Sequence, residues 1–211
     1  MLHNTFCRRL AALVLTLAVA VSAVLPVFAV YPMPIQTATE TEAVYLFNAD
    51  TGKTLLTQNA DQPRYVASLT KLMTALLLLE SGKDLNGEVT VPTDLTQEFK
   101  DIQNANGTTM GLRIGETVRR IDLLNALLIT SANDAASVIA WDVGGSLNAF
   151  IQQMNARAAE LGCTSATFTC AHGLYDYGNV ASAEDMAKIA AACAANETFA
   201  QVAGSTTYTL G

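Results

Sequence analysis

Ser68-Leu69-Thr70-Lys71 opens an almost wholly apolar segment that runs from Leu72 to Leu79. Such a segment predicts a helix, and residues three positions apart lie on one face of a helix. The Lys71 amine can therefore reach the Ser68 hydroxyl, which is the arrangement of an activated serine nucleophile. The alternative for the bare four-residue pattern is a chance helix start, with Ser68 as N-cap and Lys71 extended to solvent.

Placing Lys71 beside leucines has an energetic cost, because an ammonium group loses its hydration there unless it is paired or neutral. At the ordinary lysine pKa of about 10.4, only about one molecule in two to three thousand is neutral at pH 7. Burial lowers a lysine pKa by up to ~3 to 5 units. A buried Lys71 would therefore be a usable general base.

A second polar element, Ser131-Ala132-Asn133, lies between the apolar runs Leu123 to Ile129 and Ala135 to Trp141. A short turn between two helices would present one hydroxyl and one carboxamide to a cleft. Taken alone, it is equally an ordinary turn in which both side chains cap the following helix. A Ser-x-x-Lys nucleophile together with a Ser-x-Asn element is typical of penicillin-binding proteins and related β-lactamases.

With these two elements the chain resembles the serine-type D-alanyl-D-alanine carboxypeptidases, which are low-molecular-mass penicillin-binding proteins. The resemblance covers roughly residues 43–210 and keeps the family's order and approximate spacing in six blocks: Arg64–Thr74, Ser131–Ala136, Ala158–Gly162, Thr167–Phe168, His172–Leu174 and Ser182–Ala187. It implies an α/β (α+β) fold of the DD-peptidase and β-lactamase type. That fold has an antiparallel sheet flanked by helices and a mostly helical subdomain, with a cleft between them.

The resemblance also implies a mechanism. Ser68 would form an acyl-enzyme with peptidoglycan stem peptides and release the terminal D-alanine, with Lys71 as the base. Ser131 would pass a proton toward the leaving D-alanine, and Asn133 would hydrogen-bond the substrate amide and Lys71. His172 would contribute to the loop beside the active site without being the base. β-Lactam antibiotics are expected to acylate Ser68, and no cofactor is implied.

One family motif, Lys-Thr-Gly, is absent from the sequence. Thr51-Gly52-Lys53-Thr54 does not replace it, because this stretch precedes the nucleophile and falls in a predicted hairpin turn. We therefore expect residues 43–211 to be a catalytic domain truncated before that motif, with the later sheet strands missing.

Two other functions stay open at this point. The first is a noncatalytic fragment that binds penicillin or peptidoglycan. The second is a class A-like β-lactamase, which needs a deacylating glutamate in its Ω loop. The region from His172 to Ser182 shows no glutamate followed by Leu-Asn, so the carboxypeptidase is favoured.

The N-terminus predicts export. Arg8 and Arg9 precede an uncharged run from Leu10 to about Val30, which is typical of a signal peptide over residues 1–29. A retained membrane anchor is the alternative. Residues 30–42 read as a mobile arm. We expect an extracytoplasmic protein of the cell envelope, attached to the membrane if the leader is uncleaved or a missing C-terminal segment anchors it.

Charge and cysteine content exclude other classes. The chain has 12 basic and 19 acidic residues, and loss of a leader holding two of the basic residues would bring the net charge from −7 to −9. Nucleic-acid binding is disfavoured, because it needs a basic face. Outside the leader the cysteines are Cys163, Cys170 and Cys193. A bridge between the first two is the less favoured reading, and no spacing with a histidine suggests a metal site.

Local patterns predict further elements. A β-hairpin joins Ala43–Phe47 to Lys53–Thr57, and Glu88–Val91 is a short strand candidate. Residues 96–115 are polar and read as loops. An apolar stripe predicts a helix over 147–161 with Ser146 as N-cap, and Ser182 with Asp185 predicts a capped helix through Ala192, with a structural role for the acid.

Overall fold

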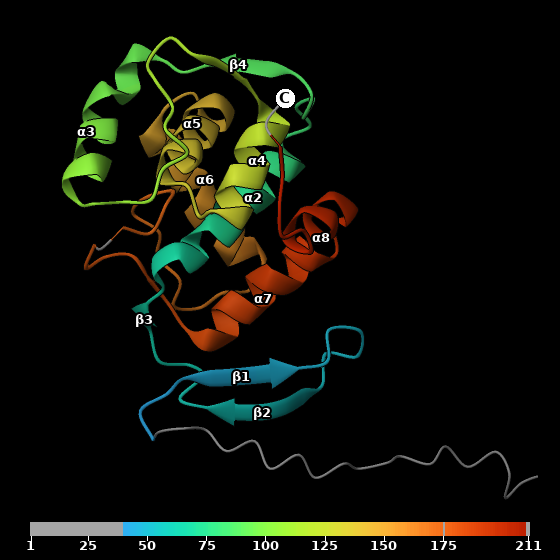
Figure 1. The fold of residues 1–211 in the computed structure, drawn as a ribbon. Helices are drawn as coiled ribbons and strands as arrows, with labels where there is room; N and C mark the ends of the chain where they lie inside the picture. Colours follow the sequence, from blue (N-terminus) through green and yellow to red (C-terminus); the bar gives the residue numbers. More distant parts are fainter. Residues whose placement is uncertain (1–39, 175, 210–211) are drawn as a thin grey trace, which may run out of the picture. The chain divides into compact units, whose positions relative to one another are not determined.

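The computed structural model describes residues 40–174 and 176–209 (Figure 1). The predicted leader, and residues 30–39 of the predicted arm, lie outside the described residues. Seven α-helices form the main body of the described part: α2 (Thr70–Glu80), α3 (Thr96–Asn104), α4 (Arg120–Ile129), α5 (Asn133–Gly144), α6 (Leu147–Glu160), α7 (Ala183–Ala194) and α8 (Glu197–Ala203).

Helix α2 is the central element of this body. It packs against α4, α5, α6 and α7 (Figure 1). A helix that is apolar on all sides needs partners on all sides, and the leucine-rich sequence of α2 meets this condition. Its fully buried side chains include Met73, Ala75, Leu76 and Leu78. The start of α2, where Lys71 lies, is therefore held by several helices at once.

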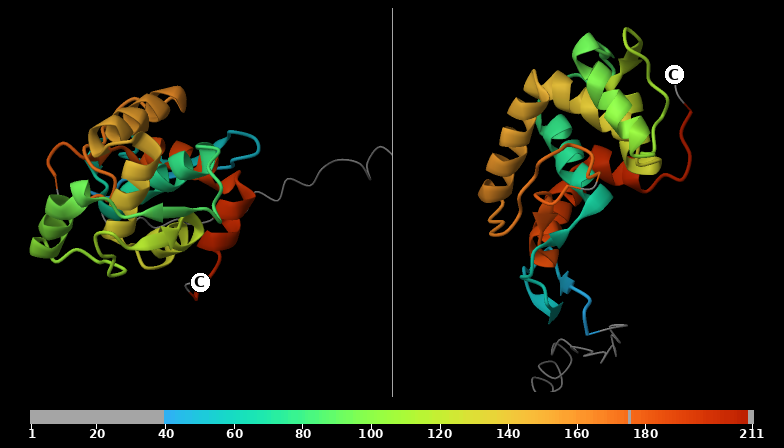
Figure 2. Two further views of the ribbon diagram at one scale, coloured as in Figure 1. Left: turned by 90° about the horizontal axis from the view of Figure 1, so that it is seen from above. Right: turned by 90° about the vertical axis from the view of Figure 1, so that its left-hand side faces the viewer.

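The strands form three antiparallel pairs. β1 (Val44–Phe47) pairs with β2 (Thr54–Gln58), β3 (Arg64–Tyr65) with β6 (Val180–Ala181), and β4 (Glu88–Thr90) with β5 (Thr117–Arg119). The predicted hairpin and short strand are therefore confirmed. Helix α7 packs on β1 (Figure 2), which gives the predicted combination of antiparallel strands and covering helices.

One sequence prediction was wrong. Residues 96–104, expected to be loop, form α3. Leu95, Phe99 and Ile102 are spaced four and three residues apart, which places them on one face of a helix. Leu95 and Ile102 are buried, and α3 packs against α5. The following residues 105–115 are irregular, as expected.

The two predicted helix caps are confirmed. The Ser146 side chain accepts a hydrogen bond from the Ala149 N–H at the start of α6. The Ser182 side chain accepts one from the Asp185 N–H at the start of α7. Both bonds satisfy a backbone donor that has no partner within its helix. The capping hydroxyls of Ser146 and Ser182 therefore allowed the starts of α6 and α7 to be predicted from the sequence.

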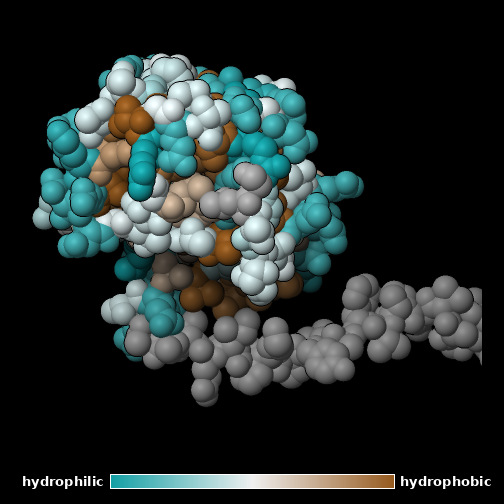
Figure 3. Space-filling model, turned by 45° about the horizontal axis from the view of Figure 1, so that its top comes forward, coloured by the Kyte–Doolittle hydropathy of each residue, from teal (hydrophilic) through white to brown (hydrophobic). Residues whose placement is uncertain are grey.

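The face in Figure 3 is mostly hydrophilic, with hydrophobic residues in separate small areas. Single exposed apolar residues are normal on a folded domain. Among residues 40–174 and 176–209, no helix has the length and apolar character needed to cross a bilayer.

Candidate active site

Ser68 and Lys71 lie at the entrance to α2. Ser68 belongs to a single 3-10 turn, η1 (Ala67–Leu69), and Lys71 lies in the first turn of α2. The predicted contact is present, because Lys71 Nζ lies 3.3 Å from Ser68 Oγ. Ser68 is exposed, whereas Lys71 is only 2% exposed. Ser68 makes no capping hydrogen bond, so the alternative of a capped helix start with a solvated lysine is wrong.

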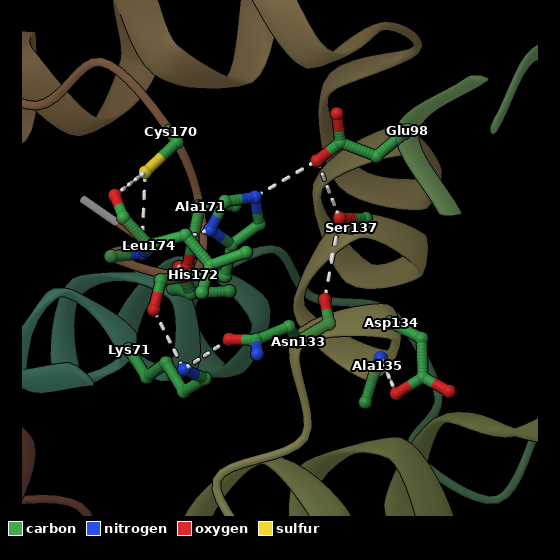
Figure 4. Close-up of polar contacts among 12 residues, drawn as sticks. Lys71, Glu98, Asn133, Asp134, Ala135, Ser137, Cys170, Ala171, His172 and Leu174 are labelled. Carbon is green, nitrogen blue, oxygen red and sulfur yellow. Dashed lines mark hydrogen bonds and ion pairs between the residues drawn. The ribbon is translucent and has the colours of Figure 1, made fainter. Parts of the chain in front are cut away.

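Two short hydrogen bonds hold the Lys71 amine. Lys71 Nζ donates to Asn133 Oδ1 at 2.7 Å and to the His172 backbone carbonyl at 2.6 Å. Figure 4 shows the amine between these two acceptors, which come from α5 and from the loop before β6. Burial lowers the pKa of Lys71 to about 8, although the neighbouring Cys170 opposes this shift. The sequence argument for an amine with a depressed pKa is thereby supported.

The three contacts of the amine are compatible with both of its protonation states, and an ammonium can donate to all three acceptors. A neutral amine has two N–H groups and one lone pair. In the neutral form, the two short contacts, to Asn133 and His172, use both N–H groups. The lone pair is then left for the Ser68 hydroxyl at the longer distance of 3.3 Å. With a pKa of about 8, roughly one tenth of the amine is neutral at pH 7, compared with about one part in three thousand at a pKa of 10.5.

The turn between α4 and α5 places Ser131 and Asn133 differently. Ser131 lines a cavity of about 380 Å³ together with Ser68 and Lys71. Within the described part of the chain, its hydroxyl makes no hydrogen bond with either of them. Asn133 is buried and faces Lys71 directly. Neither side chain caps α5, whose N-cap is Ala132, so the reading of a simple capping turn is wrong.

Backbone strain is concentrated around this cavity. Ser131 has φ +58° and Ala67 has φ +45°, both in the left-handed region that favours glycine. Such residues cost about 1–3 kcal/mol each and persist only where the surroundings impose them. One imposing contact is visible: Gly173 approaches the Ala67 carbonyl so closely that a Cβ at Gly173 would overlap it. The turn that carries Ser68 and the loop that carries His172 are therefore in direct backbone contact.

Asp134 supports the site from the other side of Asn133. Its carboxylate accepts hydrogen bonds from the backbone N–H groups of Met110, Gly111 and Leu112, each at 3.0 Å. This anchors the irregular segment after α3 to the first turn of α5. In that segment Gly107 lies against the Asn133 amide, where a Cβ would be only 2.7 Å from Nδ2. The segment therefore restricts the orientation of Asn133.

His172 contributes its carbonyl to Lys71, while its ring points the other way. Figure 4 shows the ring directed toward Glu98 on α3. Nε2 lies 3.0 Å from Glu98 Oε1, and Nδ1 accepts a hydrogen bond from the Leu174 N–H at 3.0 Å. Burial lowers the pKa of His172, but the contacts with Cys170 and Glu98 outweigh burial and raise it. Glu98 was not predicted from the sequence as a site residue.

The three cysteines outside the predicted leader, Cys163, Cys170 and Cys193, are unpaired, so the less favoured bridge between Cys163 and Cys170 is not formed. Cys170 lies beside His172 and accepts a hydrogen bond from the Gly173 N–H at 3.2 Å. It also lines a second cavity of about 400 Å³ with His172 and Glu98. Within residues 40–174 and 176–209, no group of histidine, cysteine and acidic side chains could hold a metal ion.

An exposed serine beside a buried lysine of lowered pKa, with an asparagine on that lysine, defines the class of site: it is typical of serine peptidases that use a lysine as base. Residues 31–209 match the family model of the D-alanyl-D-alanine carboxypeptidases, Peptidase_S11. The chain belongs to this family.

Individual relatives agree with the family assignment. D-alanyl-D-alanine carboxypeptidase DacF of Bacillus subtilis is 33% identical over 153 residues, which are 72% of this chain and 39% of the relative. D-alanyl-D-alanine endopeptidase of Pseudomonas aeruginosa is 33% identical over 175 residues, or 83% of this chain and 54% of the relative. The crystal structure of a Streptomyces DD-transpeptidase superposes with a TM-score of 0.69 at 32% identity, covering 75% of this chain and 62% of that one. The chain thus spans about two fifths to three fifths of the proteins it resembles.

Proposed function

We propose that this chain carries the acylating site of a serine-type D-Ala-D-Ala carboxypeptidase, which removes the terminal D-alanine from peptidoglycan stem peptides. The observation that carries the proposal is the buried Lys71 amine, which lies 3.3 Å from an exposed Ser68 hydroxyl and is held by shorter hydrogen bonds to Asn133 and the His172 carbonyl. A lysine held in this way can accept the serine proton as the hydroxyl attacks a carbonyl.

The proposed reaction has two steps. The Ser68 oxygen attacks the carbonyl between the two D-alanines while its proton passes to the Lys71 nitrogen. The C–N bond breaks as Ser131 relays a proton to the leaving amine, so that free D-alanine departs and an ester remains on Ser68. Water then hydrolyses the ester, which releases the shortened peptide and restores the hydroxyl. Asn133 would bind the substrate amide, and the Ser68 N–H would stabilise the oxyanion.

The noncatalytic fragment stays the second candidate, because the family's Lys-Thr-Gly motif does not occur in the sequence. A class A-like β-lactamase is less favoured, since the segment 172–182 contains no glutamate that could activate a deacylating water. The partners and the location are also part of the proposal. The partners are peptidoglycan stem peptides and β-lactams. The location is the cell envelope, to which residues 1–29 would direct the chain as a signal peptide.

Intact-mass measurement after incubation with benzylpenicillin tests the proposal. We expect one penicilloyl adduct on the full chain and none on Ser68→Ala. An unmodified wild-type mass, or an adduct that survives in Ser68→Ala, would contradict it. Release of D-alanine from a peptide ending in D-Ala-D-Ala separates the two candidates, because a binding fragment would be acylated by penicillin without releasing D-alanine.

A further inference from the structure

We propose that Glu98 is a positioning residue for the reaction at Ser68: by fixing the His172 ring, it fixes the backbone carbonyl that orients the Lys71 amine. This inference rests on the proposed function. It concerns a residue on α3, a helix that contributes no side chain to the contacts around Ser68 and Lys71.

Glu98 connects three separate parts of the molecule through a single oxygen. Its Oε1 lies 3.0 Å from His172 Nε2 and 3.0 Å from the Ser137 hydroxyl on α5. The Asn133 carbonyl, 3.3 Å from the same hydroxyl, is a second and more distant acceptor for its one hydrogen. Hydrogen bonding to His172 is the main reason that the pKa of Glu98 lies below its ordinary value. An ionised carboxylate therefore holds the His172 ring and the Ser137 hydroxyl, which lies one helical turn after Asn133 on α5.

The hydrogen bonds of the His172 ring define its tautomer. Leu174 N–H can only donate, so Nδ1 must be the bare, accepting nitrogen. The hydrogen of the neutral ring is then on Nε2, which donates it to Glu98. With both nitrogens engaged, the ring cannot rotate without breaking a bond. Because the carbonyl of the same residue accepts from Lys71 at 2.6 Å, a fixed ring restricts where that carbonyl lies.

The loop has other anchors, so Glu98 is not needed to fold it. Thr74 Oγ1 on α2 donates to the Ala171 carbonyl at 2.6 Å, and Asn179 Nδ2 donates to Thr70 Oγ1 at 2.8 Å. Asn155 on α6 bonds both backbone groups of Phe168 at 2.8 Å. Removing the Glu98 carboxylate should leave the loop folded and free only the His172 side chain and the peptide unit that carries its carbonyl.

The test measures the second-order rate of Ser68 acylation by a fluorescent penicillin, per folded molecule of the full chain. We expect Glu98→Ala to lower this rate about 10- to 100-fold, the effect of a displacement of the order of 1 Å in a catalytic contact. Glu98→Gln should stay within about threefold of wild type, because its amide oxygen can accept from both His172 and Ser137. Asp101→Ala is the matched control on the same helix; its carboxylate accepts from Gln97 at an exposed position, and its rate should not change.

A spectroscopic measurement tests the positioning without acylation. The two-bond ¹H–¹⁵N correlation of the His172 ring reports its tautomer, and the signal is identified by its loss in His172→Gln. Above about pH 9, where the wild-type ring is neutral, wild type and Glu98→Gln should show one fixed Nε2–H tautomer, whereas Glu98→Ala should show averaging between tautomers. The inference would be overturned if Glu98→Ala kept the ring signal of wild type, or if it reacted as fast as Asp101→Ala. It would also be overturned if Glu98→Gln were as slow as Glu98→Ala. Failure of the unmodified chain to react with penicillin would contradict the proposed function instead.

Discussion

Two buried charged groups, Lys71 and Asp185, stand near the start of their helices, and each ties a loop to its helix. Asp185 is fully buried and accepts hydrogen bonds from the Thr164 N–H, the Ser165 N–H and the Ser165 hydroxyl at 2.9, 3.0 and 2.6 Å. Lys71 is also buried, with two short bonds and one longer contact to Ser68. Both side chains are buried, but the surroundings of Asp185 favour its charged form, whereas those of Lys71 favour its neutral form.

The surroundings of Asp185 stabilise its ionised form. Burial alone would raise the pKa of Asp185, but the hydrogen bonds from Ser165 and Thr164 outweigh burial and lower it. Around Lys71 the balance is reversed, because burial dominates and lowers the pKa to about 8. A buried side chain that keeps its charge can link a loop to a helix, whereas a buried amine that favours its neutral form is a candidate base. This comparison separates a structural site from a candidate catalytic one without any reference to motifs.

The substitution Lys71→Met tests the difference between Lys71 and Asp185 most directly. Without the base we expect the rate of Ser68 acylation to fall by about 10² to 10⁴. The melting temperature should change little, because removal of a buried amine whose charge is poorly stabilised offsets the loss of the donor to Asn133 and to the His172 carbonyl. Stopped-flow acylation and thermal denaturation measure the two effects. Lys71→Met that keeps its acylation rate would show that Lys71 is as structural as Asp185.

The pH dependence of the same reaction tests the direction of the Lys71 shift. Because the neutral amine is the reactive form, the acylation rate should rise roughly tenfold per pH unit at low pH and level off above about pH 8. A plateau reached only above about pH 10 would mean that burial does not depress the pKa of this lysine. The profile is measured with penicillin in excess across pH 6 to 10.

The opposite result is expected for Asp185→Asn. The backbone donors of Thr164 and Ser165 would face an amide whose NH₂ group cannot accept, so the free energy of unfolding should fall by about 1–3 kcal/mol. Acylation per folded molecule should be unchanged. Since the folded-state pKa of Asp185 is depressed, its contribution is present above the unfolded-state pKa of about 4 and is lost as the pH falls below it.

Urea denaturation at pH 7 and at pH 4 measures both parts of that expectation. The stability difference between wild type and Asp185→Asn should be smaller at the lower pH. A variant with full stability and lowered acylation would place Asp185 in the reaction and remove the contrast with Lys71.

The smallest expected effect concerns the cysteines. The proximity of His172 and the hydrogen bond from the Gly173 N–H outweigh burial and lower the pKa of Cys170, while burial raises the pKa of Cys163 to about 11 and of Cys193 to about 12. Iodoacetamide should therefore alkylate Cys170 several times faster than the other two near pH 8, because the thiolate is the reactive form. Peptide mapping of a partially alkylated sample measures the order, and equal rates at all three sites would contradict it.

Elements whose signals are local were predictable from the sequence. The apolar run of α2, the Ser146 and Ser182 caps and the hairpin each depend on residues within a few positions of one another. Helix α3 was missed because only Leu95, Phe99 and Ile102 signal it within a polar stretch. That spacing was readable and is the signal that could have found the helix.

In the candidate site, too, contacts between residues close in sequence were predictable and contacts between distant residues were not. The Ser68–Lys71 contact follows from spacing within one helix, whereas the contact with Asn133 was inferred from family resemblance and spans 62 positions. Glu98 and the His172 carbonyl were not predicted, because their contacts join residues 74 and 101 positions apart through packing. No local pattern records such a contact. The roles of Ser68, Lys71, Ser131, Asn133 and His172 stay predictions until the variants are measured.

The close approach of Gly173 to the Ala67 carbonyl has a consequence for sequence variation. At φ +78° the residue already adopts a backbone that other L-amino acids rarely take, and any side chain would press directly on the turn that carries Ser68. A library randomised at this codon and selected for function should return glycine alone, while neighbouring exposed positions such as Tyr177 accept many residues. The absence of a Cβ at this buried position thus makes one residue of an irregular loop as intolerant of mutation as the helical core.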